Sequence, residues 1–483
     1  MDPICSRSFT ARRLGVAMLA VAATLALASC DRDLTPQIAD GIRQQVAGAP
    51  PATVRRDVWD DVGHFYEQRM FAPRWVRDGR VDDARLALRV LLRAPEHGLA
   101  APDYGEPDLS RELSDTRAIE DALAKDPAKS AQLDVRITTA VLALGRDVAV
   151  GRRGPATIDP RWKVRREPPD LGGTLSAAAD AGELDAWLDR VRPRHPEYAA
   201  LQKTLADVHA QGGSEATRDD RARRIALNLE RWRWLPDDLG ARHVLVNLPA
   251  FYMAVREQGR PVVEMKVVVG TPERKTPLFS DTMETVVFSP YWNVPDSIAE
   301  GETAPAAARD PRFLARNQIE ILRRDKDGAT IVDPASVDWD DEDAVKALAF
   351  RQRPGAHNAL GHVKFLFPNQ YDVYLHDTPA DALFARQGRA FSHGCIRVEK
   401  PEALASYLLR DRPEWDAQRI EKAMHQDDEQ HVALKDTLPV HIVYFTAWPD
   451  GRGGVQLWPD VYGYDAKQAA AAVGGTRRAA SAD

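Results

Sequence analysis

The sequence predicts an α+β multidomain protein, in which a helical N-terminal domain precedes a mostly β domain with a helical insertion. In the first half, apolar residues recur at intervals of three and four, as at Leu133, Ile137 and Val141. This period indicates helices with one buried stripe. From about residue 240 the period changes to short runs such as HVLVNL, VVEMKVVVG and VHIVYFTAW. Such runs, rich in β-branched and aromatic residues and separated by Pro, Gly and Asn, are typical of strands.

These composition changes also predict where the parts of the chain begin and end. Residues 223–236, RRIALNLERWRWLP, form a helix with Ile225, Leu229 and Trp232 on one face,. Residues 30–52 are polar with Pro and Gly, as expected of a tether. The last residues are of low complexity and predict disorder. The predicted organisation is a signal peptide over 1–29, a tether over 30–52, a helical domain over 53–215, a β domain over 222–450 with an insertion at about 299–354, and a disordered tail over 466–483.

The first thirty residues predict secretion and lipidation. Arg12 and Arg13 precede the apolar run 14–28, which ends in the sequence LASC at Cys30. The run is shorter than the roughly 20 residues that span a bilayer, and this arrangement is typical of a secretory signal. Its end resembles the bacterial lipobox, in which the cysteine is acylated. We therefore expect a periplasmic protein anchored by lipid, and Asp31 slightly favours the inner membrane over the outer. An uncleaved anchor helix and a signal cut elsewhere are the alternatives.

The number of cysteines and the net charge reduce the classes of function that this chain can have. Once the signal is removed and Cys30 is lipidated, Cys395 is the only thiol left in the chain,. Most structural cysteines of oxidising compartments are paired, so this unpaired one is either a small buried apolar residue or a nucleophile. The net charge of −7 becomes more negative when the signal leaves. Nucleic acid is excluded as a partner, because binding phosphates needs a basic surface.

A base is expected near this thiol. In the strand YDVYLH, alternation places Tyr374 and His376 on one face,. A histidine with a pKa near its ordinary 6.5 suits proton transfer from a thiol at neutral pH. His376 is therefore the candidate general base and acid, with Tyr374 as a helper beside it. His393 is the alternative proton acceptor.

The residues around the thiol complete a candidate catalytic site. The sequence SHGC, with Ser392 and Gly394 before Cys395, allows successive backbone N–H groups to point at one place and form an oxyanion hole,. Ser392 and His393 are expected to hold this loop by hydrogen bonds. Arg397 lies two residues beyond the cysteine, and its planar fork suits a substrate carboxylate.

The spacing of these residues resembles a known family. Fifteen residues separate His376 from SHGC, which is similar to the H-x(14–17)-[ST]-H-G-C signature of bacterial L,D-transpeptidases with a YkuD-type catalytic domain. Further segments resemble the larger, YcbB-like members that have a helical scaffold domain: RIALNLERWRWLP, TPLFSD, SPYWNVP, PGAHNALGHVKFLFPN and YLHDTP. The resemblance extends from about residue 52 to residue 447. One departure is that the family's small peptidoglycan-binding domain is missing before the RWRWLP helix.

The resemblance implies a reaction and a set of partners. The thiolate of Cys395 would attack the bond between diaminopimelate and D-alanine in a peptidoglycan tetrapeptide stem. The thioester would then pass to the side-chain amine of a second diaminopimelate, which gives a 3-3 crosslink. His376 would act as base and then acid, the backbone of His393, Gly394 and Cys395 would form the oxyanion hole, and the insertion would resemble the family's capping subdomain. No cofactor or metal is implied.

Three other functions fit the same residues. Water in place of the amine would make the protein an L,D-carboxypeptidase. A lipoprotein that only binds peptidoglycan is a second alternative, although such a protein has no use for a free thiol. A metal site would use His357, His362, His376 and His393, but no sequence such as HExxH supports it,.

Overall fold

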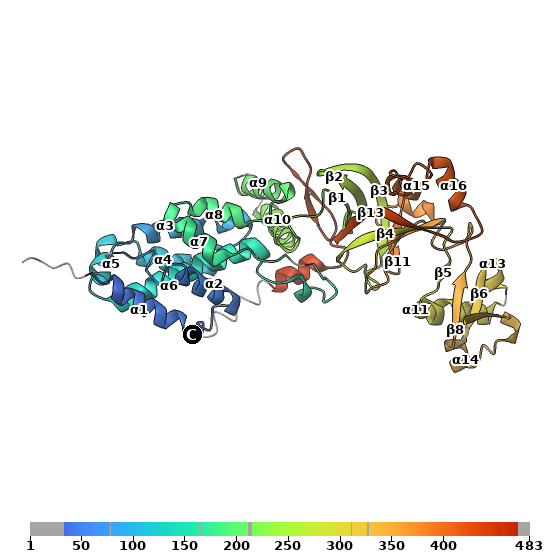
Figure 1. Cartoon of the computed structure of the whole chain (residues 1–483), viewed down its shortest axis with the longest axis horizontal. Coiled ribbons are helices and arrows are strands. Elements are labelled where there is room, and N and C mark those ends of the chain that lie inside the picture. The colour runs from blue at the N-terminus through green and yellow to red at the C-terminus, as the bar shows by residue number, and fades with distance from the viewer. Residues whose placement is uncertain are drawn as a thin grey trace, which may run out of the picture.

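The computed structural model describes residues 33–471, except residues 78, 165, 211–214, 311 and 326–327. Figure 1 shows an elongated molecule, with a helical half at one end, the main sheet in the middle and the insertion at the other end. The predicted signal peptide and Cys30 lie outside the described residues. Within the described ranges, no helix is both long and apolar enough to cross a membrane.

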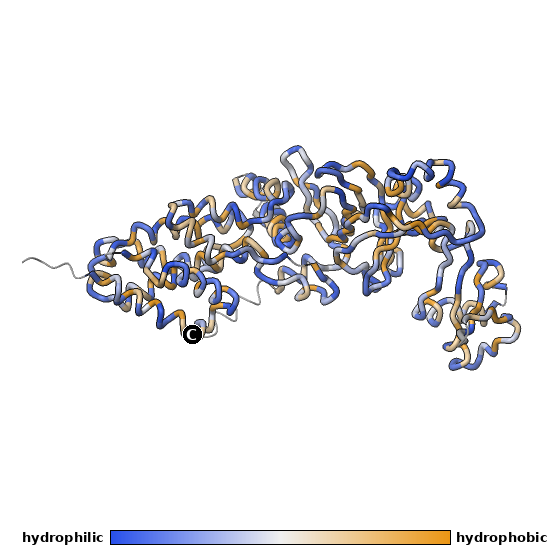
Figure 2. Tube along the Cα trace, in the orientation of Figure 1, coloured by the Kyte–Doolittle hydropathy of each residue, from blue (hydrophilic) through white to orange (hydrophobic). Residues whose placement is uncertain are grey.

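The N-terminal half packs its helices around the central helix α6, whose residues Leu133, Ile137 and Val141 are at most 1% exposed. In Figure 2 the apolar residues of this half gather on inward turns. The predicted helical class of this half is therefore confirmed. Its helices are α1 (Thr35–Val46), α2 (Arg56–Glu67), α3 (Asp82–Leu92), α4 (Glu106–Glu112), α5 (Thr116–Leu123), α6 (Pro127–Val150), α7 (Leu171–Ala181) and α8 (Leu184–Val191). Helix α9 (Pro196–Ala210) follows them but packs against the next helix, α10 (Glu215–Trp234), and its buried apolar residues belong to the core of the second half.

A buried carboxylate holds the loop after α2 against α6. Asp134 is fully buried and accepts hydrogen bonds from the backbone N–H groups of Arg74 (3.0 Å), Trp75 (2.6 Å) and Val76 (2.9 Å). The hydroxyl of Tyr66 also donates to it, at 2.6 Å. A buried charge is stable only when it is hydrogen-bonded in this way.

We expect Asp134→Ala to destabilise the helical half by about 3–5 kcal/mol, because three buried N–H groups lose their acceptor. Thermal unfolding of the purified protein measures this loss. Asp121→Ala removes an exposed carboxylate of the same half and should change the free energy of unfolding by less than about 0.5 kcal/mol. Equal effects of the two substitutions would contradict the assigned role of Asp134.

The predicted tether is wrong for residues 35–46, which form α1. Ile38 and Ile42 of this helix are 3% and 0% exposed, and α1 packs along α6. The prediction relied on the polar composition of the segment and gave no weight to two apolar residues four positions apart. The burial of these two side chains stabilises the helix.

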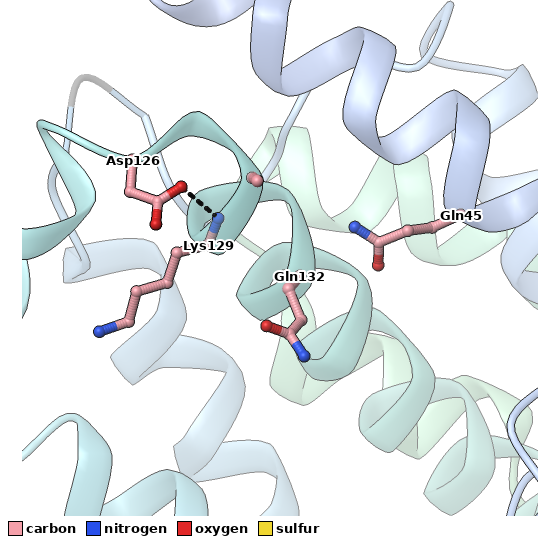
Figure 3. Close-up of a pocket in the computed structure, with 5 residues that line it drawn as sticks. Gln45, Asp126, Lys129 and Gln132 are labelled. Carbon is pink, nitrogen blue, oxygen red and sulfur yellow. Dashed lines mark hydrogen bonds between the residues drawn. The ribbon is translucent and has the colours of Figure 1, made fainter.

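Figure 3 shows a polar hollow between α1 and the start of α6, lined by Gln45, Asp126, Ala128, Lys129 and Gln132. Asp126 there accepts a hydrogen bond from the backbone N–H of Lys129 at 3.0 Å. This is an ordinary helix cap. The hollow lies in the helical half, apart from every predicted site residue, so we assign it no chemistry.

The second half is built on one sheet. In the described residues nine strands form it, in the order β11-β3-β12-β10-β9-β4-β13-β1-β2, and an additional pairing of β2 with β3 closes it into a barrel-like ring,. The α+β class is therefore confirmed. Its strands are β1 (Arg242–Asn247), β2 (Tyr252–Glu257), β3 (Arg260–Gly270), β4 (Ser280–Phe288), β9 (Val363–Leu366), β10 (Leu375–His376), β11 (Ala390–Ser392), β12 (Ile396–Val398) and β13 (Gln430–Val443).

The helix predicted at residues 223–236 is present as α10 (Glu215–Trp234), and its apolar face packs into the core of this half. Ile225, Leu229 and Trp232 are at most 1% exposed, and Trp232 stacks on Phe445 with ring centroids 4.4 Å apart. Helices α15 (Pro401–Leu408) and α16 (Ala417–Met424) and the hairpin of β14 (Ala447–Pro449) and β15 (Val455–Leu457) complete this half. The hairpin lies partly beyond the predicted boundary at residue 450.

The predicted disordered tail is wrong at its start, because residues 464–471 are helical. Asp465 forms an ion pair with the buried guanidinium of Arg231 on α10 at 2.6 Å, and Gln468 accepts a hydrogen bond from the same side chain at 3.0 Å. These contacts, which low-complexity composition does not reveal, fix the helix. Residues 472–483 lie outside the described part.

The insertion is not only helical, as predicted, but contains its own sheet. Its strands β5 (Trp292–Asn293), β6 (Ile319–Asp325), β7 (Gly328–Val332) and β8 (Leu348–Gln352) pair in the order β5-β8-β6-β7. Short helices α11 (Asp296–Ile298), α12 (Ala304–Arg309), α13 (Phe313–Arg316) and α14 (Glu342–Lys346) surround it. The charged composition suggested helices, whereas a small core that includes Ile321 and Phe350 supports strands.

Candidate active site

The candidate site lies on two short parallel strands, β10 and β12. Leu375 pairs with Ile396 in this ladder, and both side chains are fully buried in the core. The N–H of Ile396 donates to the carbonyl of Tyr374 at 3.2 Å. The register therefore places Cys395 beside Tyr374.

The predicted site residues share the opposite face of this ladder. The register pairs His376 with Arg397 directly. Because side chains alternate along a strand, Tyr374, His376, Cys395 and Arg397 project to one side. The rings of Tyr374 and His376 lie 5.7 Å apart, edge to face. The structure thus brings these four predicted residues together.

His376 is held as a neutral base. It is 4% exposed, and its Nδ1 donates to the backbone oxygen of Asp377 at 2.6 Å, which leaves Nε2 as the acceptor. Burial lowers the pKa of His376 to about 3, and the positive charges of Arg397 and Lys364 act in the same direction. The expectation of an ordinary histidine pKa is therefore wrong, because the sequence does not show the burial.

The carbonyl that orients His376 is itself fixed. The carboxylate of Asp377 accepts the N–H groups of His362 and Thr378, both at 2.7 Å. Gly361 has φ +60°, and a Cβ there would lie 2.3 Å from Asp377 Oδ2. Only glycine fits this position without moving the carboxylate.

Cys395 is a free, partly exposed thiol. Its Sγ donates to the backbone oxygen of Asp372 at 3.7 Å, not to His376. Burial raises the pKa of the Cys395 thiol, while hydrogen bonds from Tyr374 and the charge of Arg397 oppose that rise. Burial and the adjacent sulfur also raise the pKa of Tyr374. The resting site therefore holds a neutral thiol beside a neutral imidazole.

Ser392 braces the loop that carries the thiol. Its Oγ donates to the backbone oxygen of Cys395 at 2.5 Å and accepts from the N–H of Gly394 at 3.1 Å. Gly394 has φ +126°, and its carbonyl accepts from Thr276 Oγ1 at 2.8 Å. Sequence reasoning missed Thr276, which lies more than a hundred residues away in the chain.

The proposed oxyanion hole needs a correction. The N–H of Gly394 is already used by Ser392, so it does not point at a substrate. Among the hydrogen bonds of the described residues, none uses the N–H of His393 or of Cys395. These two groups are the free backbone donors of the loop.

His393 points away from the thiol, toward the insertion. Its Nε2 lies 2.7 Å from Glu302 Oε1, and the same oxygen accepts from Arg274 at 2.9 Å. Burial lowers the pKa of His393, against the charge of Glu302. No sequence pattern had marked Glu302 or Arg274. This arrangement favours His376 over His393 as the base.

Arg397 is available for an anion. No ion pair joins its guanidinium to an acidic side chain in the described ranges, and its buried Nε has no hydrogen-bond partner. Burial lowers the pKa of Arg397. The metal alternative finds no geometric support, because the described part of the chain holds no group of three His, Cys, Asp or Glu side chains arranged as ligands.

A thiol, a neutral imidazole acceptor and free backbone donors lie close together here, and these are the groups that cysteine acyl transfer requires. Comparison with known proteins then gives the family. Residues 60–205 match a scaffold domain, and residues 241–440 match an L,D-transpeptidase catalytic domain. The chain therefore combines a scaffold domain with a YkuD-type L,D-transpeptidase catalytic domain. The predicted ranges 53–215 and 222–450 contain these matches, and their boundaries otherwise stay predictions.

A curated relative is consistent with this family. It is a Haemophilus influenzae protein named "Putative L,D-transpeptidase", and it is 36% identical over 242 residues. The matched part covers 50% of this chain and 48% of the relative, so the chain spans about half the length of that protein.

We expect Ser392→Ala to destabilise the catalytic half by about 1–3 kcal/mol, because the buried N–H of Gly394 and the carbonyl of Cys395 lose their partner. Thermal unfolding is the measurement. Ser392→Thr keeps the hydroxyl and should restore most of the loss. A Thr variant as unstable as the Ala variant would contradict the bracing role.

We expect Arg397→Gln to slow alkylation of Cys395 by iodoacetamide near pH 8. Removing the positive charge raises the pKa of the thiol further, so less thiolate is present at that pH. Arg397→Lys keeps a charge and should react more nearly as the unaltered protein does. The difference in alkylation rate should vanish at a pH where the Cys395 thiol of every variant is fully ionised. A difference that persists there would show that the substitution changes the access of iodoacetamide to the sulfur instead.

Proposed function

We propose that this chain is a peptidoglycan L,D-transpeptidase with Cys395 as nucleophile. The observation that carries the proposal is the pairing of β10 with β12, which sets Cys395, His376 and Arg397 on one face. The donor is a tetrapeptide stem, cleaved between diaminopimelate and D-alanine. The acceptor is the side-chain amine of a second diaminopimelate, and the product is a 3-3 crosslink.

In the first half-reaction, the thiol turns from the Asp372 carbonyl toward His376 as substrate binds. Nε2 of His376 takes the thiol proton while sulfur forms its bond to the donor carbonyl carbon. This is general-base catalysis from a neutral pair, because the pKa of His376 is too low for a resting imidazolium,. The same proton then passes to the D-alanine nitrogen as the carbon–nitrogen bond breaks, which leaves a thioester.

The surrounding groups stabilise the charges that form. The N–H groups of His393 and Cys395 suit the oxyanion, where donors that need not reorganise lower the barrier most. Tyr374 supplies a hydroxyl beside the sulfur. Arg397 suits a substrate carboxylate, because its guanidinium has no acidic partner among the described side chains.

Location is part of the proposal. We propose a periplasmic enzyme, held at the membrane by a lipid on Cys30, with the inner membrane slightly favoured. The support is the sequence of residues 1–31, an apolar run that ends in LASC and is followed by Asp,. The insertion lies next to the thiol loop through Glu302 and suits a capping role over the substrate.

The decisive experiment is intact-protein mass spectrometry after incubation with a carbapenem, a class of compound to which this family is sensitive. One acyl adduct is expected on the unaltered protein and none on Cys395→Ala. Incubation with disaccharide-tetrapeptide should release D-alanine and give dimers joined between two diaminopimelates. Unchanged turnover by Cys395→Ser would refute the nucleophile, and tripeptide without dimers would make the protein an L,D-carboxypeptidase.

A further inference from the structure

Asp372 occupies an unusual position directly beside the nucleophile. Its backbone oxygen accepts the Cys395 thiol at 3.7 Å, and its φ of +52° lies in the left-handed region. Asp adopts that conformation more readily than most non-glycine residues, and residues held in it cluster at functional sites. The side chain is exposed.

The carboxylate of Asp372 is unpaired. No hydrogen bond or ion pair reaches it from another side chain within the described ranges. Burial raises the pKa of both Cys395 and Tyr374, and the negative charge of Asp372 acts in the same direction. Its backbone oxygen lies 3.7 Å from the sulfur. Arg397 lies farther along the face, beside His376. The residues next to the thiol therefore include both a cation and an unpaired anion.

This anion opposes the first half-reaction. A negative charge near a thiol disfavours the thiolate, so Asp372 gives no help to attack on the donor. After acylation the sulfur is part of a neutral thioester, and that penalty disappears. The group that arrives next is an amine, which is positively charged at neutral pH.

We propose that Asp372 is a specificity residue for the acceptor, and that its carboxylate binds the acceptor ammonium beside the thioester. This inference rests on the proposed function. The acceptor class is a primary ammonium, and water, which carries no charge, gains nothing from Asp372. The residue therefore favours transfer to an amine over hydrolysis.

The proton balance assigns different tasks to Asp372 and His376. The carboxylate stabilises the charged amine, so its contribution lies in binding. Nε2 of His376, neutral at working pH, takes one ammonium proton as the nitrogen forms its bond to the thioester carbon. The carbon–sulfur bond breaks, the second proton goes to the departing thiolate, and the proton on His376 returns to water. Amide, thiol and one released proton are the products.

The test is Asp372→Asn, assayed with disaccharide-tetrapeptide as donor and acceptor. Asparagine tolerates the left-handed conformation, so the loop should keep its shape. We expect the acceptor concentration at half-maximal transfer to rise roughly fivefold, the factor for about 1 kcal/mol from a partly exposed ion pair. The ratio of dimer to hydrolysed tripeptide should fall by a similar factor. Asp427→Asn, at another exposed carboxylate of the same domain, is the matched control and should leave this ratio unchanged.

Carbapenem acylation distinguishes the acceptor role of Asp372 from the proposed function. Asp372→Asn should acylate at least as fast as the unaltered protein, because the opposing charge is gone. Normal acylation with an unchanged dimer ratio would overturn the acceptor role and leave the proposed function intact. Absence of any adduct on the unaltered protein would overturn the proposed function itself. A fall in acylation and in transfer together would show that Asp372 only shapes the loop, which also contradicts the inference.

Discussion

The parallel pairing of β10 with β12 is the constraint on which the site depends. Both strands are shorter than four residues, yet the register of their pairing decides which side chains share a face. A slip of one residue would turn Cys395 toward the core and bring Ile396 to the surface. The full burial of Leu375 and Ile396 prevents this, since either side chain would lose its core contacts,. Core packing thus fixes the chemistry on the opposite face.

The electrostatics of the site follow from that burial. An imidazole sealed in the sheet, next to two cations, stays neutral, and a half-covered thiol stays protonated. Neither group is reactive alone. In the proposed mechanism substrate brings them together, and until then the protonated thiol resists the oxidation to which a thiolate is prone.

Local sequence pattern was enough to predict the α+β class, the α10 stripe and the four residues on the sheet face, because strand alternation and the SHGC spacing depend on neighbours in the chain. Features set by distant partners were not predictable. Helix α1 and the helix at 464–471 owe their order to α6 and to Arg231. The N–H of Gly394 is not available to an oxyanion, because it donates to the side chain of Ser392. No sequence pattern predicts the rotamer of that serine. The sheet of the insertion likewise depends on its own small core.

Within the described ranges, the hydrogen bond between the insertion and the thiol loop uses one oxygen of Glu302, and this oxygen accepts from both His393 and Arg274. Because one carboxylate oxygen is bonded to both basic groups, any motion of the insertion that withdraws Glu302 breaks both hydrogen bonds together. The electrostatic potential around His393, two residues from the nucleophile, would then become more positive. The position of the insertion would consequently affect the electrostatic potential near the thiol as well as the space around it.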